Sequence, residues 1–338
     1  MKQGILAVLF TLFSSAASAG PTTPLFASDP PIRITIKGPM ASLASNRSAP
    51  PRPATLTVTG TQESYPIMLS ARGITRRQGD VCQFPPLRVD FTQHPPPTSL
   101  FGGQRRLKLV THCRKNEDFQ QKVLLEYAAY RLYNLMTPQS FRARLANIDY
   151  VDEAGRPYIS RIGFFVEDGD DMAKRNDLRE PKLGDRVSVN QLEPRGAARF
   201  ALFNYMIGNL DWSMRAGPAG ESCCHNGRLL AANKAGSGVL VPVPYDFDFS
   251  GLVDAPYATP PDAIPVGSVR ERVYRGYCIH TNEARAIAAD MSARRSELLG
   301  SLSTIPGMDA RTRSKAADYL GGFFRDLDSG KALKNCVN

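Results

Sequence analysis

The hydrophobic pattern of the chain changes its period between residues 112 and 119, and this change limits the folds the chain can adopt. Before it, short runs alternate apolar or β-branched residues with polar ones, as strands with one buried face do. Proline- and glycine-rich turns separate these runs, and 40–53 is predicted as a loop. We therefore expect a mostly antiparallel sheet. Its strands are predicted at 32–36, 54–59, 65–71, 87–91 and 107–110.

After the change, apolar residues recur at helical spacing from Phe119 to Leu135, and Pro138 marks the end of this helix. A β-hairpin is predicted next, and from residue 167 onward the pattern is mainly helical. The first hairpin covers 145–151 and 158–166, a second covers 229–232 and 239–244, and helices are predicted at 197–207, 282–299 and 310–324. This order of elements indicates an α+β protein.

The N-terminus has the pattern of a secretory signal peptide. Lys2 precedes an apolar run from Ile5 to Phe13, and small residues end in Ala17-Ser18-Ala19, a typical cleavage site. The run is short for a membrane span, which needs about 20 residues, although an uncleaved anchor is the alternative. No later segment is long and apolar enough to span a bilayer. We expect export to the periplasm or release from the cell.

The six cysteines agree with export, because an even number beyond a signal peptide indicates disulfides in an oxidising compartment. Cys82 and Cys113 are expected to pair, since both fall near predicted strands of the N-terminal half. The other four, Cys223, Cys224, Cys278 and Cys336, would then pair within the C-terminal half. A soft-metal site at Cys223-Cys224-His225 is a less favoured alternative, because the histidines lack paired metal-ligand spacing.

The formal net charge of +10 does not indicate nucleic-acid binding. The basic residues are scattered along the chain, for example at Arg76-Arg77 and Arg105-Arg106, and they form no stripe interleaved with aromatic residues. We therefore expect no nucleic-acid partner. A basic surface still favours phosphorylated or acidic ligands.

Three polar clusters follow predicted helices and strands and are candidates for chemistry. Asp211 comes directly after an apolar helix, Asn226 precedes a strand, and Asp246 and Asp248 follow a buried strand. Carboxylate and amide oxygens are the ligands that Mg²⁺ prefers. An aspartate in a loop can orient or deprotonate a hydroxyl. Because the hairpin between Asn226 and Asp246 reverses the chain, we expect both to face one cleft.

The order Asp211…Asn226…strand…Asp246-Phe247-Asp248 resembles the atypical kinases of the spore-coat CotH family and, more distantly, the HipA-type toxin kinases. Two upstream regions are similar to the CotH arrangement as well. Ala71-Arg72-Gly73 with 84–91 resembles its strand region, and 163–168 resembles the strand that leads to its interlobe linker. The resemblance covers roughly residues 60–255 and rests on the order of motifs that are individually unspecific.

The resemblance implies a role for each residue of the clusters. Asp211 would be the catalytic aspartate that orients the acceptor hydroxyl. Asn226 and Asp246 would hold Mg²⁺ or Mn²⁺ on the phosphates of ATP, and Asp248 would support that ion or bind a second one. The 15 positions between Asp211 and Asn226 exceed the short catalytic loop of ordinary protein kinases.

The resemblance also implies the nucleotide contacts. Lys108 would pair with the phosphates and Glu126, on the long helix, would orient it. The backbone at Glu167 and Asp168 would meet the adenine. This chain lacks the lysine that the family tends to carry near Arg88, so Arg88 and Arg72 remain alternatives for the phosphate-binding cation. Alternation also permits Lys108 to be an ordinary solvent-facing strand residue.

The expected fold is a two-lobed, protein-kinase-like α+β fold. After the signal peptide at 1–19, an N-lobe at 20–167 would contain an antiparallel sheet and the long helix 119–135, and a mainly helical C-lobe would cover 168–338. The expected function is Mg²⁺- or Mn²⁺-dependent phosphoryl transfer from ATP to a hydroxyl of an unidentified protein or small molecule. The alternatives are a catalytically inactive binding module on the same fold and a metal-dependent hydrolase.

Overall fold

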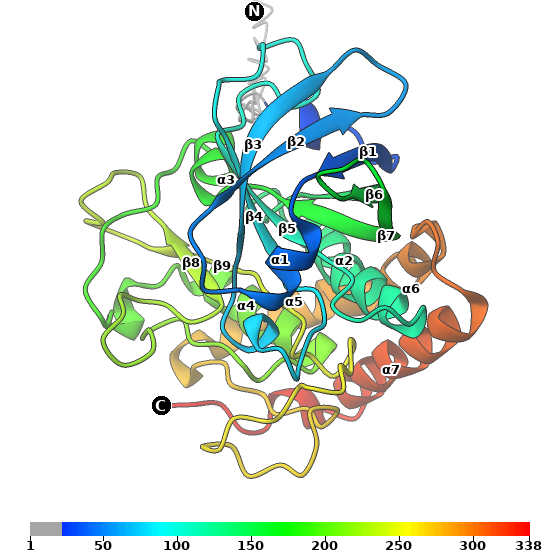
Figure 1. The fold of residues 1–338 in the computed structure, drawn as a ribbon. Coiled ribbons are helices and arrows are strands. Elements are labelled where there is room, and N and C mark those ends of the chain that lie inside the picture. The colour runs from blue at the N-terminus through cyan, green and yellow to red at the C-terminus, as the bar shows by residue number, and fades with distance from the viewer. Residues whose placement is uncertain (1–21) are drawn as a thin grey trace, which may run out of the picture.

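Seven strands form a closed barrel at one end of the molecule (Figure 1). The structure is a computed structural model that describes residues 22–338, so the predicted signal peptide lies outside the described residues. The strand order around the barrel is β1-β2-β3-β4-β5-β7-β6. The strands are β1 (Ile32–Lys37), β2 (Arg52–Val58), β3 (Ser64–Ala71), β4 (Leu87–Phe91), β5 (Arg106–Val110), β6 (Ala143–Val151) and β7 (Pro157–Val166).

Alternation along the strands fills the barrel interior with apolar side chains. In β1, Ile32, Ile34 and Ile36 are buried, while Arg33 and Lys37 are exposed. The same period applies to the other strands, because successive side chains of a strand point to opposite faces. The interior therefore forms one hydrophobic cluster, which includes Leu56, Leu69, Val89, Leu107, Leu109 and Phe165.

The barrel closes through a parallel pairing between β1 and β6, in register from Ile32 with Ala146 to Lys37 with Val151. All other neighbouring strands of the barrel pair antiparallel. The expected two-lobed kinase-like fold with an antiparallel sheet is therefore wrong, and the structure is an α+β protein dominated by a closed, mixed barrel with helices. Alternation identifies strands but does not reveal which strand pairs with the free edge of the first one.

The helices pack against the outside of the barrel and against one another. Helix α2 lies along β6 and β7, and α4 packs against α5, α7 and the small β8–β9 sheet (Figure 1). In the described part of the chain, no helix is both long and apolar enough to cross a membrane. The remaining elements are α1 (Met40–Ser45), α2 (Asp118–Met136), α3 (Gly169–Arg175), α4 (Pro194–Ile207), β8 (Gly227–Leu230), β9 (Val241–Pro244), α5 (Thr281–Ala293), α6 (Arg295–Gly300) and α7 (Ala310–Asp328).

The sequence located most of these elements. The five early strands, the long helix, both hairpins and the helices of the C-terminal half are confirmed within a few residues. Two details are wrong: 40–53 contains the short helix α1, and 282–299 is divided into α5 and α6 at Arg294. The predicted boundary between residues 167 and 168 lies between β7 and α3.

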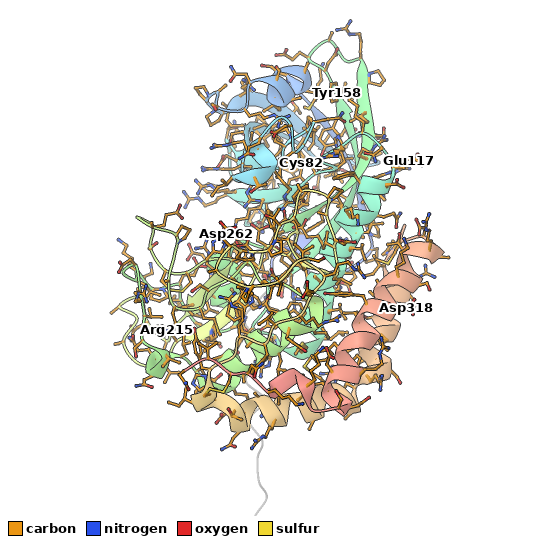
Figure 2. The ribbon with its side chains drawn as sticks, turned by 90° about the horizontal axis from the view of Figure 1, so that it is seen from below. Cys82, Glu117, Tyr158, Arg215, Asp262 and Asp318 are labelled. Atoms are coloured by element: carbon orange, nitrogen blue, oxygen red, sulfur yellow. A yellow bond between two sulfur atoms is a disulfide. The ribbon has the colours of Figure 1, made fainter. Side chains whose placement is uncertain are left out.

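Three disulfides connect all six cysteines. Cys82 bonds to Cys113, as expected, and the other bonds join Cys223 to Cys224 and Cys278 to Cys336. The Cys82–Cys113 bridge is buried against Phe119 and ties the β3–β4 connection to the segment before α2. Figure 2 labels Cys82 near the barrel strands and Asp318 on α7 at the margin of the molecule.

Removal of the Cys82–Cys113 bridge is expected to lower the free energy of unfolding by about 3 kcal/mol, because it frees a loop of 31 residues in the unfolded chain. Urea unfolding of a Cys82→Ala/Cys113→Ala variant measures the loss. Gln78→Ala, an exposed position on the same connection, is the control and is expected to change stability by less than about 0.5 kcal/mol. A double variant as stable as the wild type contradicts the prediction.

Candidate functional site

Backbone hydrogen bonds bring three chain segments together, those carrying Asp211, Asn226 and Asp246. Ser213 and His225 exchange two backbone hydrogen bonds, of 2.9 and 3.1 Å, which place Asn226 next to the Asp211 loop. The Tyr245 N–H donates to the Asn226 carbonyl at 3.2 Å, beside the first pair of the β8–β9 ladder. The hairpin thus returns the chain to Asn226, as the sequence predicted.

The Asp211 loop is fixed by the end of α4. Gly208 ends the helix with a left-handed conformation (φ 63°), which glycine adopts without steric cost. The buried side chain of Asn209 donates to Asn204 Oδ1 at 3.0 Å and accepts from the Asp211 N–H at 3.1 Å. Trp212 donates through Nε1 to the Asn209 carbonyl at 2.9 Å. These bonds hold Asp211 at one position relative to the helix.

Asp211 is hydrogen bonded on both carboxylate oxygens. His225 Nε2 lies 2.6 Å from Oδ1, and Asn226 Nδ2 donates to Oδ2 at 2.9 Å and to the Asp211 carbonyl at 2.8 Å. The bond to Asp211 raises the pKa of His225 above its usual 6.5, although burial opposes the shift. The side chains of Asp211 and His225 are 28% and 35% exposed, so this pair is open to a ligand from solvent.

Asp246 follows β9 in a left-handed backbone conformation (φ 63°). Its N–H donates to the hydroxyl oxygen of Tyr130, on α2, at 3.0 Å, and its Oδ1 accepts from Arg76 at 3.2 Å. Burial disfavours ionisation of Asp246, but the nearby cations Arg76, Arg72 and Lys108 outweigh it and lower the pKa of this carboxyl. Asp246 therefore stays ionised and combines a negative charge with a 30% exposed side chain.

A buried arginine joins Asp246 to two further carboxyl groups. Arg76 Nη1 lies 2.9 Å from Glu126 Oε2, and its Nε lies 3.0 Å from Asp248 Oδ2, which also accepts from the Tyr257 hydroxyl. Burial raises the pKa of Glu126, and it raises that of Asp248 well above its usual range although Arg76 opposes both shifts. We call Glu126, Asp246 and Asp248 the acidic triad; one oxygen from each lies within 4.8 Å of the others.

Lys108 faces outward from the barrel, between the interior residues Leu107 and Leu109 of β5. Its Nζ lies 4.6 Å from the centre of the Tyr245 ring. Desolvation, helped by the positive charges of Arg72 and Arg228, lowers the pKa of Lys108 to about 8. With this pKa, Lys108 is mainly charged at neutral pH. Among the described residues no carboxylate oxygen lies within 4.0 Å of this ammonium, so its donors remain available to an anion.

The other predicted nucleotide contacts lie in different surroundings. Arg88 is paired with Lys108 in the β4–β5 register, but its guanidinium bonds to Asp90 at 2.7 Å. Glu167 is buried in an ion pair with Arg175 at 2.9 Å. Asp168 caps α3 by accepting from the Asp170 N–H and lines an open cavity of about 620 Å³ beside the β4–β5 hairpin. Glu126 pairs with Arg76 and not with Lys108.

Sequence reasoning missed two residues of the site. The sequence places Arg76 only among scattered basic residues, and it suggests His225 only as a soft-metal ligand. The close spacing of His225 and Asn226 before a strand was a usable signal for His225. Arg76 lies in the 3₁₀ turn Thr75–Arg77 of a loop, where no periodic pattern distinguishes a buried arginine from an exposed one.

The arrangement separates ligands for a cation from ligands for an anion. The amide nitrogen of Asn226 is bonded to Asp211, and within residues 22–338 no hydrogen bond is donated to its amide oxygen Oδ1. This oxygen and the Asp246 carboxylate have the chemistry of hard-cation ligands. Lys108 and Arg72 supply positive charge beside Asp246. Such a site suits a phosphorylated ligand bound together with a divalent cation.

Two comparisons with known proteins identify no family for this chain. A scan against models of protein families finds no match, and a search of curated proteins finds none either. The resemblance to CotH-type kinases therefore stays a prediction from motif order.

The His225–Asp211 bond is expected to stabilise the fold at low pH. Because the folded pKa of His225 is raised above 6.5, the stabilisation is complete below pH 6.5 and disappears as the pH rises through the folded pKa, as long as Asp211 is ionised. Urea unfolding of the wild type and His225→Gln across this range measures the difference.

His94→Gln is the matched control, since His94 is exposed, and it is expected to leave the pH profile unchanged. A difference between wild type and His225→Gln that is constant with pH contradicts the prediction.

Proposed function

We propose that this chain is a phosphotransferase that uses Mg²⁺ or Mn²⁺ to transfer a phosphoryl group from ATP to a hydroxyl of a protein or small molecule. One observation carries the proposal: Lys108 of β5 lies beside the three segments that bring together Asn226, Asp246 and the Asp211–His225 pair. The proposal rests on this site and not on a kinase-like fold, which the closed barrel contradicts.

The cation side of the proposal is supported by Asn226 and Asp246. A divalent cation held by these oxygens would neutralise charge on the phosphates of ATP. Asp246 stays ionised because neighbouring positive charges lower its pKa. Tyr130 and Arg76 fix its backbone N–H and one carboxylate oxygen, so that little conformational freedom is lost when a ligand binds.

The phosphate side is supported by Lys108 and Arg72. Lys108 is held over the Tyr245 ring without an ion pair, and a partly desolvated ammonium gains strongly from contact with a phosphate. Arg88, the alternative cation, is already bonded to Asp90. Lys108 is therefore the preferred phosphate ligand of this chain.

The Asp211–His225 pair is proposed to act on the acceptor. The acceptor oxygen attacks the γ-phosphorus, the bond from that phosphorus to the β-phosphate oxygen breaks, and ADP leaves. The hydroxyl proton passes to the Asp211 carboxylate, whose position is fixed by His225 and Asn226. Because positioning and charge neutralisation carry most phosphoryl transfer, a carboxylate held on both oxygens is a suitable base.

A metal-dependent phosphoester hydrolase is the second candidate, since the exposed Asp211–His225 pair can accept a proton from water as well as from an alcohol. Turnover of a phosphoester without ATP separates the two reactions. The inactive binding module remains a prediction from the sequence, and absence of nucleotide binding would support it.

Asp211→Asn and Asp246→Asn are each expected to lower ATP turnover by at least about a hundredfold, because each removes a charge that acts on the reacting groups. Release of ADP by the oxidised chain in Mg²⁺ or Mn²⁺ measures turnover, and thermal unfolding checks that each variant is folded. The control is Asp318→Asn, on the exposed side of α7 (Figure 2). Full activity in both site variants would rule out the proposal.

Affinity for ATP is expected to fall as the pH rises through about 8, where Lys108 loses its charge. Because only one proton is lost, the affinity for ATP can fall by at most about tenfold for each pH unit. Lys108→Arg is expected to bind with a flat profile, because arginine stays charged. Lys108→Met is expected to bind ATP at least about tenfold more weakly at neutral pH. Calorimetric titration measures all three, and equal affinity of Lys108→Met and wild type contradicts the assignment.

A further inference from the structure

Arg76 occupies the centre of the acidic triad, and all three nitrogens of its guanidinium contact carboxyl oxygens. Nη1 and Nη2 reach the two oxygens of Glu126 at 2.9 and 3.3 Å, Nη2 also reaches Asp246 at 3.2 Å, and Nε reaches Asp248 at 3.0 Å. The Arg76 side chain is 8% exposed. A planar fork of donors is therefore enclosed by three carboxyl groups from two parts of the chain.

The fold holds Arg76 in this position. It lies in the turn Thr75–Arg77, on the connection between β3 and β4. The Arg72 N–H donates to the Pro86 carbonyl at 2.9 Å, which closes the base of this connection, and the Cys82–Cys113 bridge ties it to the segment before α2. Arg76 is thus a fixed part of the site and not a side chain that swings in from the surface.

The same three carboxyl groups have the spacing of ligands around one divalent cation, since an oxygen from each lies within 4.8 Å of the others. Arg76 bonds to those groups and cannot lose its charge. A divalent cation at this position would have to displace an arginine whose side chain is 8% exposed and bonded to all three carboxyl groups. The triad is therefore closed to metal as long as Arg76 is present.

We propose that Arg76 is a built-in replacement for a second metal ion, so that the site takes one divalent cation per chain. This inference rests on the proposed function, in which that one cation binds at Asn226 and Asp246. Phosphoryl-transfer sites commonly use two cations to neutralise charge, and here a guanidinium supplies the second positive centre through Asp246. Arg76 is a positioning residue in this scheme, and Asp248, predicted as a second metal ligand, is an arginine ligand.

The test counts bound Mn²⁺ by electron paramagnetic resonance of the free ion, with the oxidised chain and no nucleotide. Wild type is expected to bind one ion, and Arg76→Ala is expected to bind two, because the triad is then open. The second ion is expected to disappear in Arg76→Ala/Asp248→Asn. Arg76→Lys keeps a positive charge in the triad and is expected to bind one ion, as is Arg77→Ala, the exposed neighbouring position.

Each other outcome is informative. Arg76→Ala that binds one ion as the wild type does, or that loses the ion, overturns the inference. Should Arg76→Ala fold poorly, refolding with and without Mn²⁺ gives the answer. A folding yield that Mn²⁺ restores in Arg76→Ala but not in Arg76→Ala/Asp248→Asn supports the inference, and a yield that does not depend on Mn²⁺ overturns it. A wild type that binds no Mn²⁺ contradicts a cation site preformed at Asn226 and Asp246, while a single ion gained by Arg76→Ala still supports the role of Arg76.

Discussion

The ion pairs of Arg76 are the interaction on which the candidate site depends. They connect the β3–β4 loop, helix α2 and the segment after β9, three regions far apart in sequence. Loss of one partner would leave buried charge without compensation, which typically costs about 3–5 kcal/mol. The Asp246 carboxylate is held at the point where these regions meet.

The fold shows where sequence periodicity stops being informative. The alternation of Leu107, Lys108 and Leu109 predicted a strand with one buried face, and the spacing of apolar residues in 119–135 predicted the long helix; both are confirmed. Closure of the barrel was not predictable in this way, because β1 finds its parallel partner at Ala146 and beyond. An open sheet and a closed barrel need the same alternation in each strand, so the pattern does not distinguish them.

The candidate site divides in the same way. Asp211, Asn226 and Asp246 were predictable as candidates because each adjoins a predicted helix or strand, and backbone hydrogen bonds bring their segments together. Arg76 was missed because its partners Glu126 and Asp246 lie 50 and 170 positions away. The local sequence pattern does not indicate such long-range contacts. Arg88 and Lys108 lie opposite each other in the β4–β5 register, and they differ in their surroundings. The Arg88 guanidinium bonds to the Asp90 carboxylate, whereas the Lys108 ammonium lies over the Tyr245 ring.

The closed barrel is compatible with the proposed phosphate-binding site because the residues of that site lie outside the barrel. The interior is filled with apolar side chains, so charged groups must point outward from its strands. Lys108 does so from β5, and Arg72 follows directly after β3. The acidic and amide groups come from the segments after α4, before β8 and after β9. Positive charge from the barrel wall thus meets negative charge from the helical part of the chain, and a phosphate with a divalent cation fits the boundary between them.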